Sequence, residues 1–143
     1  MSFLLDTNVV SEWLKPRPNP GVVSWLATVD EDQTCLSVVT ITELRYGIER
    51  LQAGARRRRL DAWLRYELLP RFEGRILPVD LAIAEECGRL VARSEAAGRP
   101  IEPRDAFIGA TAEVYGLILV TRNVSDFQPT IKNLFTPWPP NGS

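Results

Sequence analysis

The 143-residue chain contains no histidine. This absence excludes Ser-His and Cys-His nucleophile pairs, imidazole metal ligands and a histidine general base. Catalytic chemistry would therefore have to come from other side chains. Carboxylates are the best candidates, acting through a hard metal ion that prefers oxygen ligands.

The chain also lacks several motifs and any long apolar run. It has no G-x-G-x-x-G, no Walker A sequence and no C-x-x-C, so a dinucleotide fold, a P-loop and a zinc site have no support. No apolar run approaches the ~20 residues of a membrane span, and the N-terminus shows no signal-peptide pattern. Cys35 and Cys87 lie in apolar surroundings, which favours free thiols in a reducing compartment. We therefore expect a cytoplasmic protein without a membrane segment.

Bulk composition is compatible with one folded unit. Apolar residues make up 45% of the chain, which supports a hydrophobic core, and we find neither an internal repeat nor a domain boundary. We expect a single domain over residues 1–143, with a proline-rich tail at 136–143. The 17 basic and 18 acidic residues nearly balance, so net charge neither predicts nor excludes a nucleic-acid partner.

Short apolar runs alternate with segments of helical periodicity. Strands are predicted at Phe3–Leu5, Thr34–Val39, Arg75–Val79 and Leu117–Val120, and a fifth is suggested at Ile131–Phe135. Helices are predicted at Asn8–Leu14, Val22–Val29, Thr40–Leu51, Arg56–Leu69, Leu81–Ala97 and Pro103–Tyr115. This alternation is typical of a parallel sheet covered on both faces. The sequence thus predicts an α/β fold, a three-layer α/β/α sandwich with a central parallel sheet of four to five strands.

Four acidic residues fall near the expected carboxyl ends of these strands. Asp6 directly follows the first strand and Asp126 follows the fourth. Asp105 lies at about the third position of the helix that leads into the fourth strand, and Glu43 lies in the first turn of the helix after the second. Sites in open parallel sheets form at this edge, where the strand order reverses. If the first and fourth strands are neighbours there, the carboxylates should share one crevice and repel one another unless a divalent cation binds.

Each acid also has a purely structural interpretation. Asp6 could be a helix N-cap, and Asp105 occupies a position where an acid favours the helix dipole. Glu43 lies off the apolar stripe of its helix, as solvated side chains do, and Asp126 could belong to an ordinary loop. The four acids favour a functional site because they coincide at one edge of one sheet.

The residues that carry these acids resemble a known family. The segments FLLDTNVVSEWL, TITELRYGIERL, PRDAFIGATAEVYGLILVTRN and VSDF resemble the motifs of PIN-domain ribonucleases, specifically the VapC and FitB-like toxins of prokaryotic toxin–antitoxin pairs. The resemblance implies that Asp6, Glu43, Asp105 and Asp126 are catalytic and bind Mg²⁺ or Mn²⁺. It also implies a PIN-like fold, endonucleolytic cleavage of single-stranded or structured RNA, an antitoxin that blocks the site, and a homodimer.

The sequence departs from some family members in one place. After Asp105 the helix continues as Ala110-Thr111-Ala112-Glu113, without a further acid in the next turn. Whether one or two metal ions bind is therefore open at this point. In either case metal-activated water, not the 2′-hydroxyl, should attack, and the products should carry a 5′-phosphate and a 3′-hydroxyl.

Five further side chains are candidates to orient the ligands or the substrate. Thr7, Asn8 and Asn123 could orient metal ligands or a phosphate group, although Thr7 and Asn8 are also good helix caps. Arg104 and Arg122 flank the predicted site and could contact phosphate.

Two surface features have open interpretations. The run Arg56-Arg57-Arg58-Arg59 could bind RNA backbone or an acidic partner, or could simply be solvated. The apolar residues of the first two helices, Trp13, Leu14, Trp25 and Leu26, could bind an antitoxin segment or pack in the core.

Other function classes remain open. A Mg²⁺-dependent phosphohydrolase of the aspartyl-phosphate kind would need a second acid two residues after Asp6, where Asn8 stands. A receiver-type phosphoacceptor would need paired acids at its first strand, which are not evident. A third alternative is a non-catalytic or regulatory module that binds a metal ion through the same acids.

Overall fold

A computed structural model describes residues 2–140, so the last three residues of the predicted tail lie outside the described residues. Five strands form one sheet: β1 (Phe3–Leu5), β2 (Thr34–Ser37), β3 (Ile76–Leu77), β4 (Ile118–Val120) and β5 (Leu134–Phe135). Their order is β3-β2-β1-β4-β5, and every neighbouring pair is parallel. The predicted parallel sheet and its suggested fifth strand are confirmed.

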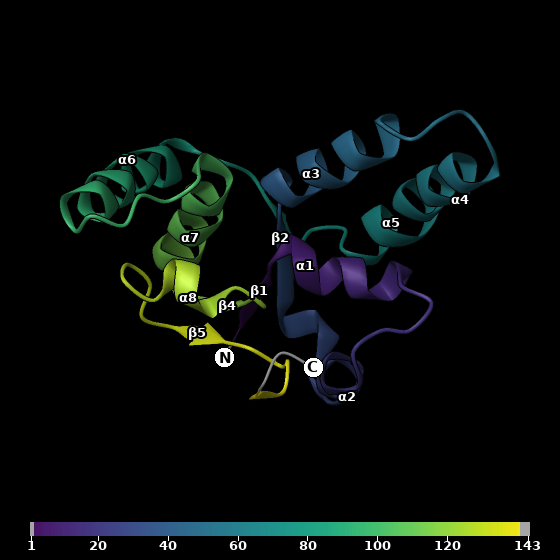
Figure 1. Ribbon diagram of the computed structural model, residues 1–143, viewed down its shortest axis with the longest axis horizontal. Coiled ribbons are helices and arrows are strands. Elements are labelled where there is room, and N and C mark those ends of the chain that lie inside the picture. Colours follow the sequence, from purple (N-terminus) through teal and green to yellow (C-terminus); the bar gives the residue numbers. More distant parts are fainter. Residues whose placement is uncertain (1, 141–143) are drawn as a thin grey trace.

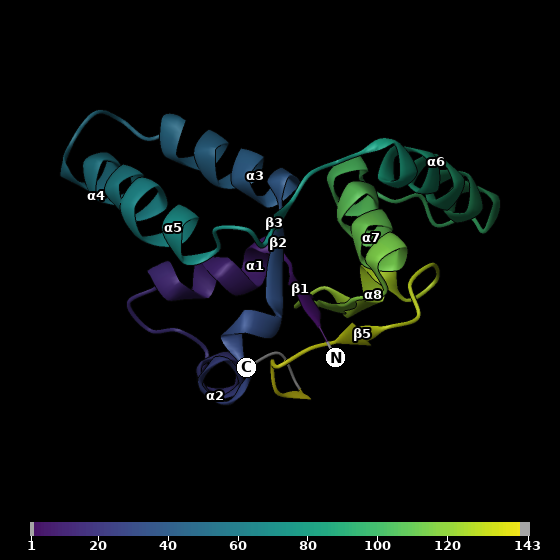
Figure 2. The same cartoon turned by 180° about the vertical axis from the view of Figure 1, so that it is seen from behind.

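Helices cover both faces of this sheet. They are α1 (Thr7–Val10) with the 3₁₀ turn η1 (Ser11–Leu14), α2 (Pro20–Thr28), the 3₁₀ turn η2 (Glu31–Gln33), α3 (Val38–Glu49), α4 (Ala55–Trp63), the π-helical stretch η3 (Leu64–Leu68), α5 (Leu69–Arg71), α6 (Leu81–Ala96), α7 (Pro103–Tyr115) and α8 (Val124–Phe127). Figures 1 and 2 show α6, α7 and α8 on one side of the sheet, and α1, α3, α4 and α5 on the other. The predicted three-layer sandwich is confirmed.

The apolar strands supply both layers of the core. Successive side chains of a strand point to opposite faces, so adjacent apolar residues serve different cores. Leu4 and Leu119 are buried in the core formed with α6 and α7. Leu5 and Val120 are buried in the core formed with α1, α3 and η3. This two-sided burial explains why β1 and β4 are continuously apolar rather than alternating.

The strand order places a topological switch point between β1 and β4. The chain passes from β1 outward to β2 and β3, then returns to add β4 and β5 on the opposite side of β1. Leu5 pairs with Val120, and the amide of Asp6 donates to the Val120 carbonyl at 2.9 Å. The two strands therefore end at the same level. A crevice at this edge is the usual ligand site of open α/β sheets.

Several predicted boundaries were wrong at strand ends. The strand predicted over Thr34–Val39 stops at Ser37, because the Ser37 hydroxyl accepts a hydrogen bond from the Val39 amide at 3.0 Å and caps α3. The strand predicted over Arg75–Val79 is reduced to Ile76–Leu77. β-Branched residues suit a strand but are tolerated in a first helical turn, so the apolar run itself did not mark the boundary.

Two helical features also differ from the predictions. The helix expected over Arg56–Leu69 is helical but contains the π-helical stretch η3 and continues to Arg71, with Pro70 in the first turn of α5, where proline is tolerated. The four-residue helix α8 was missed because it is too short to show periodicity. Asp126 therefore lies in the first turn of a helix and not in a loop.

Two further expectations concern the cysteines and the membrane. Cys35 and Cys87 are both free thiols, the first half-buried and the second buried. Among residues 2–140, we find no helix with the length and apolar character needed to cross a bilayer.

Candidate active site

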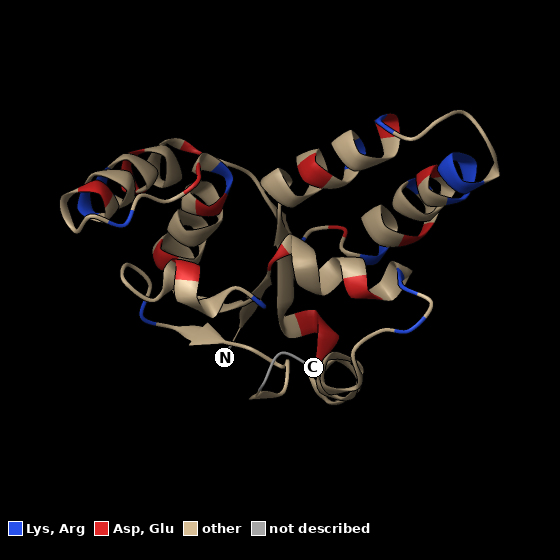
Figure 3. Cartoon of the chain, in the orientation of Figure 1, with Lys and Arg blue, Asp and Glu red and all other residues tan. Residues whose placement is uncertain are grey.

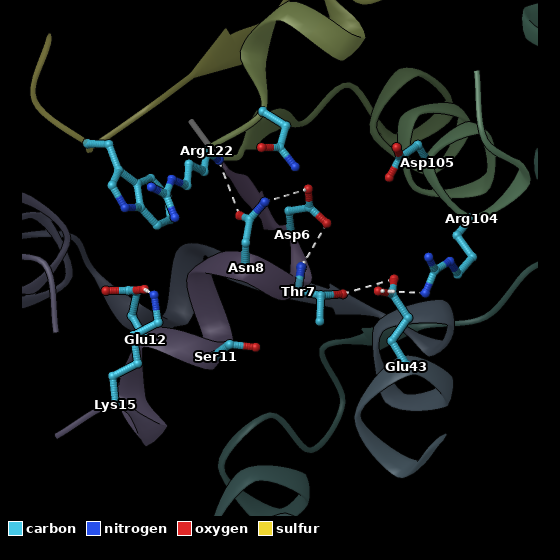
Figure 4. A pocket seen from close by; sticks show the side chains of 12 residues that line it. Asp6, Thr7, Asn8, Ser11, Glu12, Lys15, Glu43, Arg104, Asp105 and Arg122 are labelled. Carbon is cyan, nitrogen blue, oxygen red and sulfur yellow. Dashed lines mark hydrogen bonds and ion pairs between the residues drawn. The ribbon is translucent and has the colours of Figure 1, made fainter. Parts of the chain in front are cut away.

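A pocket of about 380 Å³ lies at the carboxyl ends of β1 and β4 (Figure 4). Side chains from α1, η1, α3, α7 and the segment after β4 line it, together with one residue of the C-terminal tail. The lining residues are Asp6, Thr7, Asn8, Ser11, Glu12, Lys15, Glu43, Arg104, Asp105, Arg122, Asn123 and Trp138. The fold thus brings together all the predicted site residues except Asp126.

Asp6 is both a helix cap and a buried charge. It is the N-cap of α1, and its Oδ1 accepts a hydrogen bond from the Thr7 amide at 2.8 Å. Its Oδ2 accepts from the Thr121 hydroxyl at 2.8 Å and from Asn8 Nδ2 at 3.4 Å. Burial raises the pKa of Asp6 above its ordinary value, against these three hydrogen bonds, and the charge of Asp126 raises it further. Capping therefore does not account for the whole environment of this carboxylate.

Glu43 turns from α3 toward the same pocket. Its Oε1 accepts a hydrogen bond from the Thr7 hydroxyl at 3.1 Å, and its Oε2 lies 3.4 Å from Arg104 Nη1. Burial raises the pKa of Glu43, the Thr7 and Arg104 contacts oppose this, and the charge of Asp6 adds to the increase. The interpretation of Glu43 as a freely solvated side chain is therefore wrong.

Asp105 is a pocket acid with a strongly raised pKa. It lies in the first turn of α7, two residues after Pro103, and is half-buried. Burial, followed by the charges of Asp6, Asp126 and Glu43, raises its pKa to about 6, although Arg104 lowers it. A helix N-terminus alone would lower the pKa of an acid. Repulsion among the acids and their burial thus outweigh the favourable dipole position.

Asp126 is the outlier among the four predicted acids. It is exposed on α8 and does not line the pocket, although its charge raises the pKa values of both Asp6 and Asp105. Within the described residues 2–140, no three Asp, Glu, Cys or His side chains lie close enough to hold one metal ion together. The four acids share an electrostatic field without forming a preassembled metal triad.

Hydrogen bonds connect the segment after β4 to α1. Asn8 Oδ1 accepts from the Arg122 amide at 3.2 Å, and Asn8 Nδ2 donates to the Thr121 hydroxyl at 3.3 Å. The Asn123 amide also donates to the Thr121 hydroxyl, at 3.0 Å. Asn8 therefore positions the two sides of the crevice relative to each other.

Sequence reasoning missed Thr121, which is fully buried at the centre of this network. A signal was present, because Thr121 is the first polar residue after β4, as Asp6 is after β1. It also missed the pocket residues Glu12, Lys15 and Trp138. Glu12 gave a weaker signal, as a charged residue inside the apolar segment between Val10 and Trp13.

The arginine run lies away from this pocket. Figure 3 shows basic residues gathered at the beginning of α4, at the outer end of the hairpin formed by α3 and α4. Arg57 pairs with Glu49 of α3 at 3.0 Å, and none of the four consecutive arginines lines the pocket. The run therefore has no direct contact with the candidate active site.

The two tryptophan-bearing helices do not form one apolar surface. Trp13 packs on Phe72, with ring centroids 6.1 Å apart, whereas Trp25 lies 5.3 Å from Phe3 and 5.4 Å from Phe135. A separate groove of about 320 Å³ is lined mainly by apolar residues of η1 and α2, with Glu12 and Arg71 at its sides: Glu12, Trp13, Pro18, Val22, Val23, Leu26, Ala27 and Arg71. Only part of the predicted apolar set, Trp13 and Leu26, faces this groove.

Comparison with known proteins identifies the family. Residues 3–128 match the PIN domain. The chain belongs to the PIN domain family. Among curated proteins, it is 36% identical to VapC ribonuclease Y4jK of Sinorhizobium fredii, over 96% of this chain and 99% of that relative. It is 38% identical to Toxin FitB of Neisseria gonorrhoeae, over 95% of this chain and 98% of that toxin.

Solved structures agree with this membership of the PIN domain family. The crystal structure of FitAcB from Neisseria gonorrhoeae matches with a TM-score of 0.90 and 38% identity, over 95% of this chain and 98% of that chain. A toxin–antitoxin complex from Klebsiella pneumoniae matches with a TM-score of 0.74 and 26% identity, over 96% of this chain and 98% of that chain. The PIN-like fold expected from the motifs is thereby confirmed.

Proposed function

We propose that this PIN-domain protein is a metal-dependent endoribonuclease that acts as the toxin of a toxin–antitoxin pair. One observation carries the proposal: Asp6, Glu43 and Asp105 come from three different elements and converge in one pocket at the switch point of the sheet. The names of the relatives, VapC ribonuclease and Toxin FitB, support both the reaction and the biological role.

The donor set of the pocket suits a hard divalent cation. The acids offer only oxygen ligands, and burial, with a smaller contribution from the charges of neighbouring acids, raises the pKa values of Asp6, Glu43 and Asp105. A cation would relieve this repulsion, and Mg²⁺ and Mn²⁺ prefer such ligands. Asp6, Asp105 and Glu43 would supply ligands for it, with Asp126 contributing from α8, and because these acids form no preassembled triad their carboxylates would have to move closer together to share one ion. Such an ion supplies the acidity that makes water a nucleophile at neutral pH, and it neutralises charge on the phosphate.

The surrounding side chains have separate tasks in this proposal. Thr121, Thr7 and Asn8 fix the carboxylate of Asp6 through three hydrogen bonds. Glu43, held by Thr7, orients the attacking water. The exposed guanidinium groups of Arg104 and Arg122 bind phosphate oxygens of single-stranded or structured RNA, and Asn123 orients the bound phosphate.

A cleavage assay tests the nuclease proposal. Purified protein should cleave RNA in the presence of Mg²⁺ or Mn²⁺, and excess EDTA should abolish cleavage. The fragments should carry 5′-phosphate and 3′-hydroxyl ends. Activity that persists in EDTA, or fragments with 2′,3′-cyclic phosphate ends, would rule out hydrolysis by metal-activated water.

We further propose that the antitoxin contacts the groove between η1 and α2. The groove contains Trp13 and Leu26, and Val23 at its side is 47% exposed. The similarity to a solved toxin–antitoxin complex supports a protein partner of this kind. We also propose that the toxin forms a homodimer, as the family resemblance implies.

Hydrogen exchange and sedimentation test these partner proposals. Addition of a cognate antitoxin should protect the amides of η1 and α2 from exchange. If the antitoxin also contacts the basic end of α4, the amides there should be protected as well. Segments β5 and α6 serve as internal controls that should not change. Unchanged exchange in η1 and α2 would contradict the groove proposal. Sedimentation equilibrium should give twice the mass of 16.1 kDa, and a monomer at micromolar concentration would contradict the dimer.

A further inference from the structure

Two basic side chains, Lys15 and Arg122, line the pocket on the side away from Glu43 and Asp105. Figure 4 shows Glu12, Lys15 and Arg122 on one side of Asp6, and Glu43, Arg104 and Asp105 on the other. Both groups line the same pocket. Two cations therefore stand beside the acids, on the side of the pocket opposite Arg104.

A buried carboxylate anchors the first of these cations. Glu12 is only 2% exposed, and its Oε1 accepts a hydrogen bond from the Asn19 amide at 2.7 Å. Its Oε2 forms an ion pair with Lys15, whose side chain remains 48% exposed. Burial alone would raise the pKa of Glu12, but the Asn19 amide, Lys15 and the charge of Arg122 lower it below its ordinary value. Glu12 is therefore ionised at neutral pH and orients the ammonium group of Lys15.

The second cation, Arg122, is held through its backbone amide and through an aromatic ring. The Arg122 amide is bound by Asn8, and the Arg122 guanidinium lies 5.9 Å from the centroid of the Trp138 ring. Trp138 is 7% exposed and belongs to the core that contains Leu5 and Val120. A buried aromatic ring thus supports an exposed guanidinium at the rim of the pocket.

We propose that Lys15 and Arg122 bind a phosphate of the RNA chain next to the scissile phosphate. This inference rests on the proposed nuclease function. A polynucleotide carries a charge at every phosphate, and the acids repel any phosphate that a metal ion does not neutralise. The neighbouring phosphate therefore needs a cationic wall, which Lys15 and Arg122 provide. Glu12 and Trp138 are positioning residues that act through these two cations.

The composition of the chain allows a direct test without catalysis. Lys15 and Lys132 are the only two lysines in the sequence. Lys132 is exposed and does not line this pocket. Amine acylation of the full chain is followed by mass spectrometry in EDTA, with and without an RNA oligonucleotide whose binding is confirmed by fluorescence anisotropy. RNA should slow acylation of Lys15 and leave that of Lys132 unchanged. Equal rates at Lys15 with and without bound RNA would overturn the proposal.

Phosphate is common to RNA and DNA, so the same acylation experiment is repeated with an oligodeoxyribonucleotide of the same sequence. Protection of Lys15 at a lower RNA than DNA concentration supports an RNA subsite. Protection by DNA at equal or lower concentration would overturn the assignment to RNA.

Salt dependence of binding counts the phosphate contact. Loss of one contact to single-stranded nucleic acid should reduce the slope of log K against log salt by about 0.7. We expect this reduction for Lys15→Met and no change for the matched control Lys132→Met. Because Lys15→Met alone leaves Glu12 as an unpaired buried charge, the double variant Glu12→Gln/Lys15→Met is also measured. The double variant removes one negative and one positive charge, so the net charge of the protein does not change. An unchanged slope of log K against log salt in this folded variant would therefore overturn the proposal.

The two proposals can fail separately. Cleavage of RNA with Mg²⁺ but no protection of Lys15 would refute the phosphate subsite alone. If RNA protects Lys15 but is not cleaved in the presence of any divalent cation, the nuclease function is refuted, and Lys15 is then part of a nucleic-acid binding site without that function.

Discussion

The hydroxyl of Thr121 donates a hydrogen bond of 2.8 Å to Oδ2 of Asp6, and this contact joins the residues that directly follow β4 and β1. Both side chains are buried, with exposed fractions of 0% and 5%. The bond therefore closes the switch point of the sheet and fixes the orientation of the central pocket acid.

Replacement of Thr121 by valine should destabilise the protein. The change keeps the approximate shape but removes a donor to a buried carboxylate, and hydrogen bonds to charged groups contribute about 1.5–3 kcal/mol. Urea unfolding at pH 7 in EDTA measures the free energy of unfolding. Thr42→Val is the matched control, because the exposed Thr42 hydroxyl bonds only to the Val38 carbonyl of its own helix. Equal losses in the two variants would contradict this role of Thr121.

Asp6→Asn separates the capping role of Asp6 from metal binding. Asparagine caps helices as well as aspartate, so a pure cap predicts a nearly silent change. If Asp6 binds the metal ion, RNA cleavage should fall to background and the Mg²⁺-dependent gain in stability should shrink. For the wild type this gain is about 2.7 kcal/mol at a Mg²⁺ concentration 100-fold above Kd. Thermal unfolding with and without Mg²⁺, together with the cleavage assay, decides between the two. A variant with wild-type cleavage and an unchanged Mg²⁺ effect would leave Asp6 as a cap only.

Asp105 should give the metal-free protein an unusual pH dependence. Its pKa is about 6 in the folded state and 3.8 in the reference state. Between these values the folded protein binds more protons than the unfolded chain, so the contribution of Asp105 to stability falls as pH rises. Metal-free Asp105→Asn should therefore be more stable than wild type at pH 7.5, and this advantage should shrink as the pH is lowered toward 4. Urea midpoints across this range test the sign, and an advantage that grows toward pH 4 would refute it.

Glu12 should show the opposite sign. Its pKa is lowered in the folded state, so its stabilising contribution is present above the unfolded value of 4.5 and is lost as pH falls through the folded pKa. Glutamine can keep the acceptor for the Asn19 amide but loses the ion pair with Lys15. Glu12→Gln should thus be less stable than wild type at pH 7, and the difference should diminish in acid. A constant difference from pH 7 to 3 would show that ionisation of Glu12 is not what stabilises the fold.

Gly21 should be intolerant of a side chain because the C-terminal tail packs against it. A Cβ at this position would lie 2.4 Å from the Pro137 carbonyl oxygen, so the backbone that leads to Trp138 would have to move. We expect Gly21→Ala to cost about 1–3 kcal/mol in urea unfolding. Gly47→Ala is the control, because apart from its chain neighbours and the nearby backbone of its own helix nothing lies within 4 Å of the added Cβ, and the change inside α3 should stabilise by about 1 kcal/mol. A neutral Gly21→Ala would mean that the tail is not held there.

Much of the fold was predictable because its signals are local. The apolar runs of β1 and β4 and the periodicity of the longer helices depend only on neighbouring residues, so the three layers followed from pattern alone. The helix α7 was predicted with its observed bounds, Pro103–Tyr115, because proline marks its start and Gly116 its end. Asp6, Glu43 and Asp105 could be selected for the same reason, since each has a fixed place relative to the end of one strand or the start of one helix.

Contacts between distant segments could not be predicted in this way. The sequence left open whether β1 and β4 are neighbours, because strand order depends on how whole layers pack. It did not distinguish Asp126, which does not line the pocket, from Asp105, which does; both are acids in first helical turns. The burial of Glu12, the bond from Thr121 to Asp6 and the support of Arg122 by Trp138 each join positions whose proximity is set by register and packing. Tertiary structure alone therefore decided which charges share the pocket and which are anchored there.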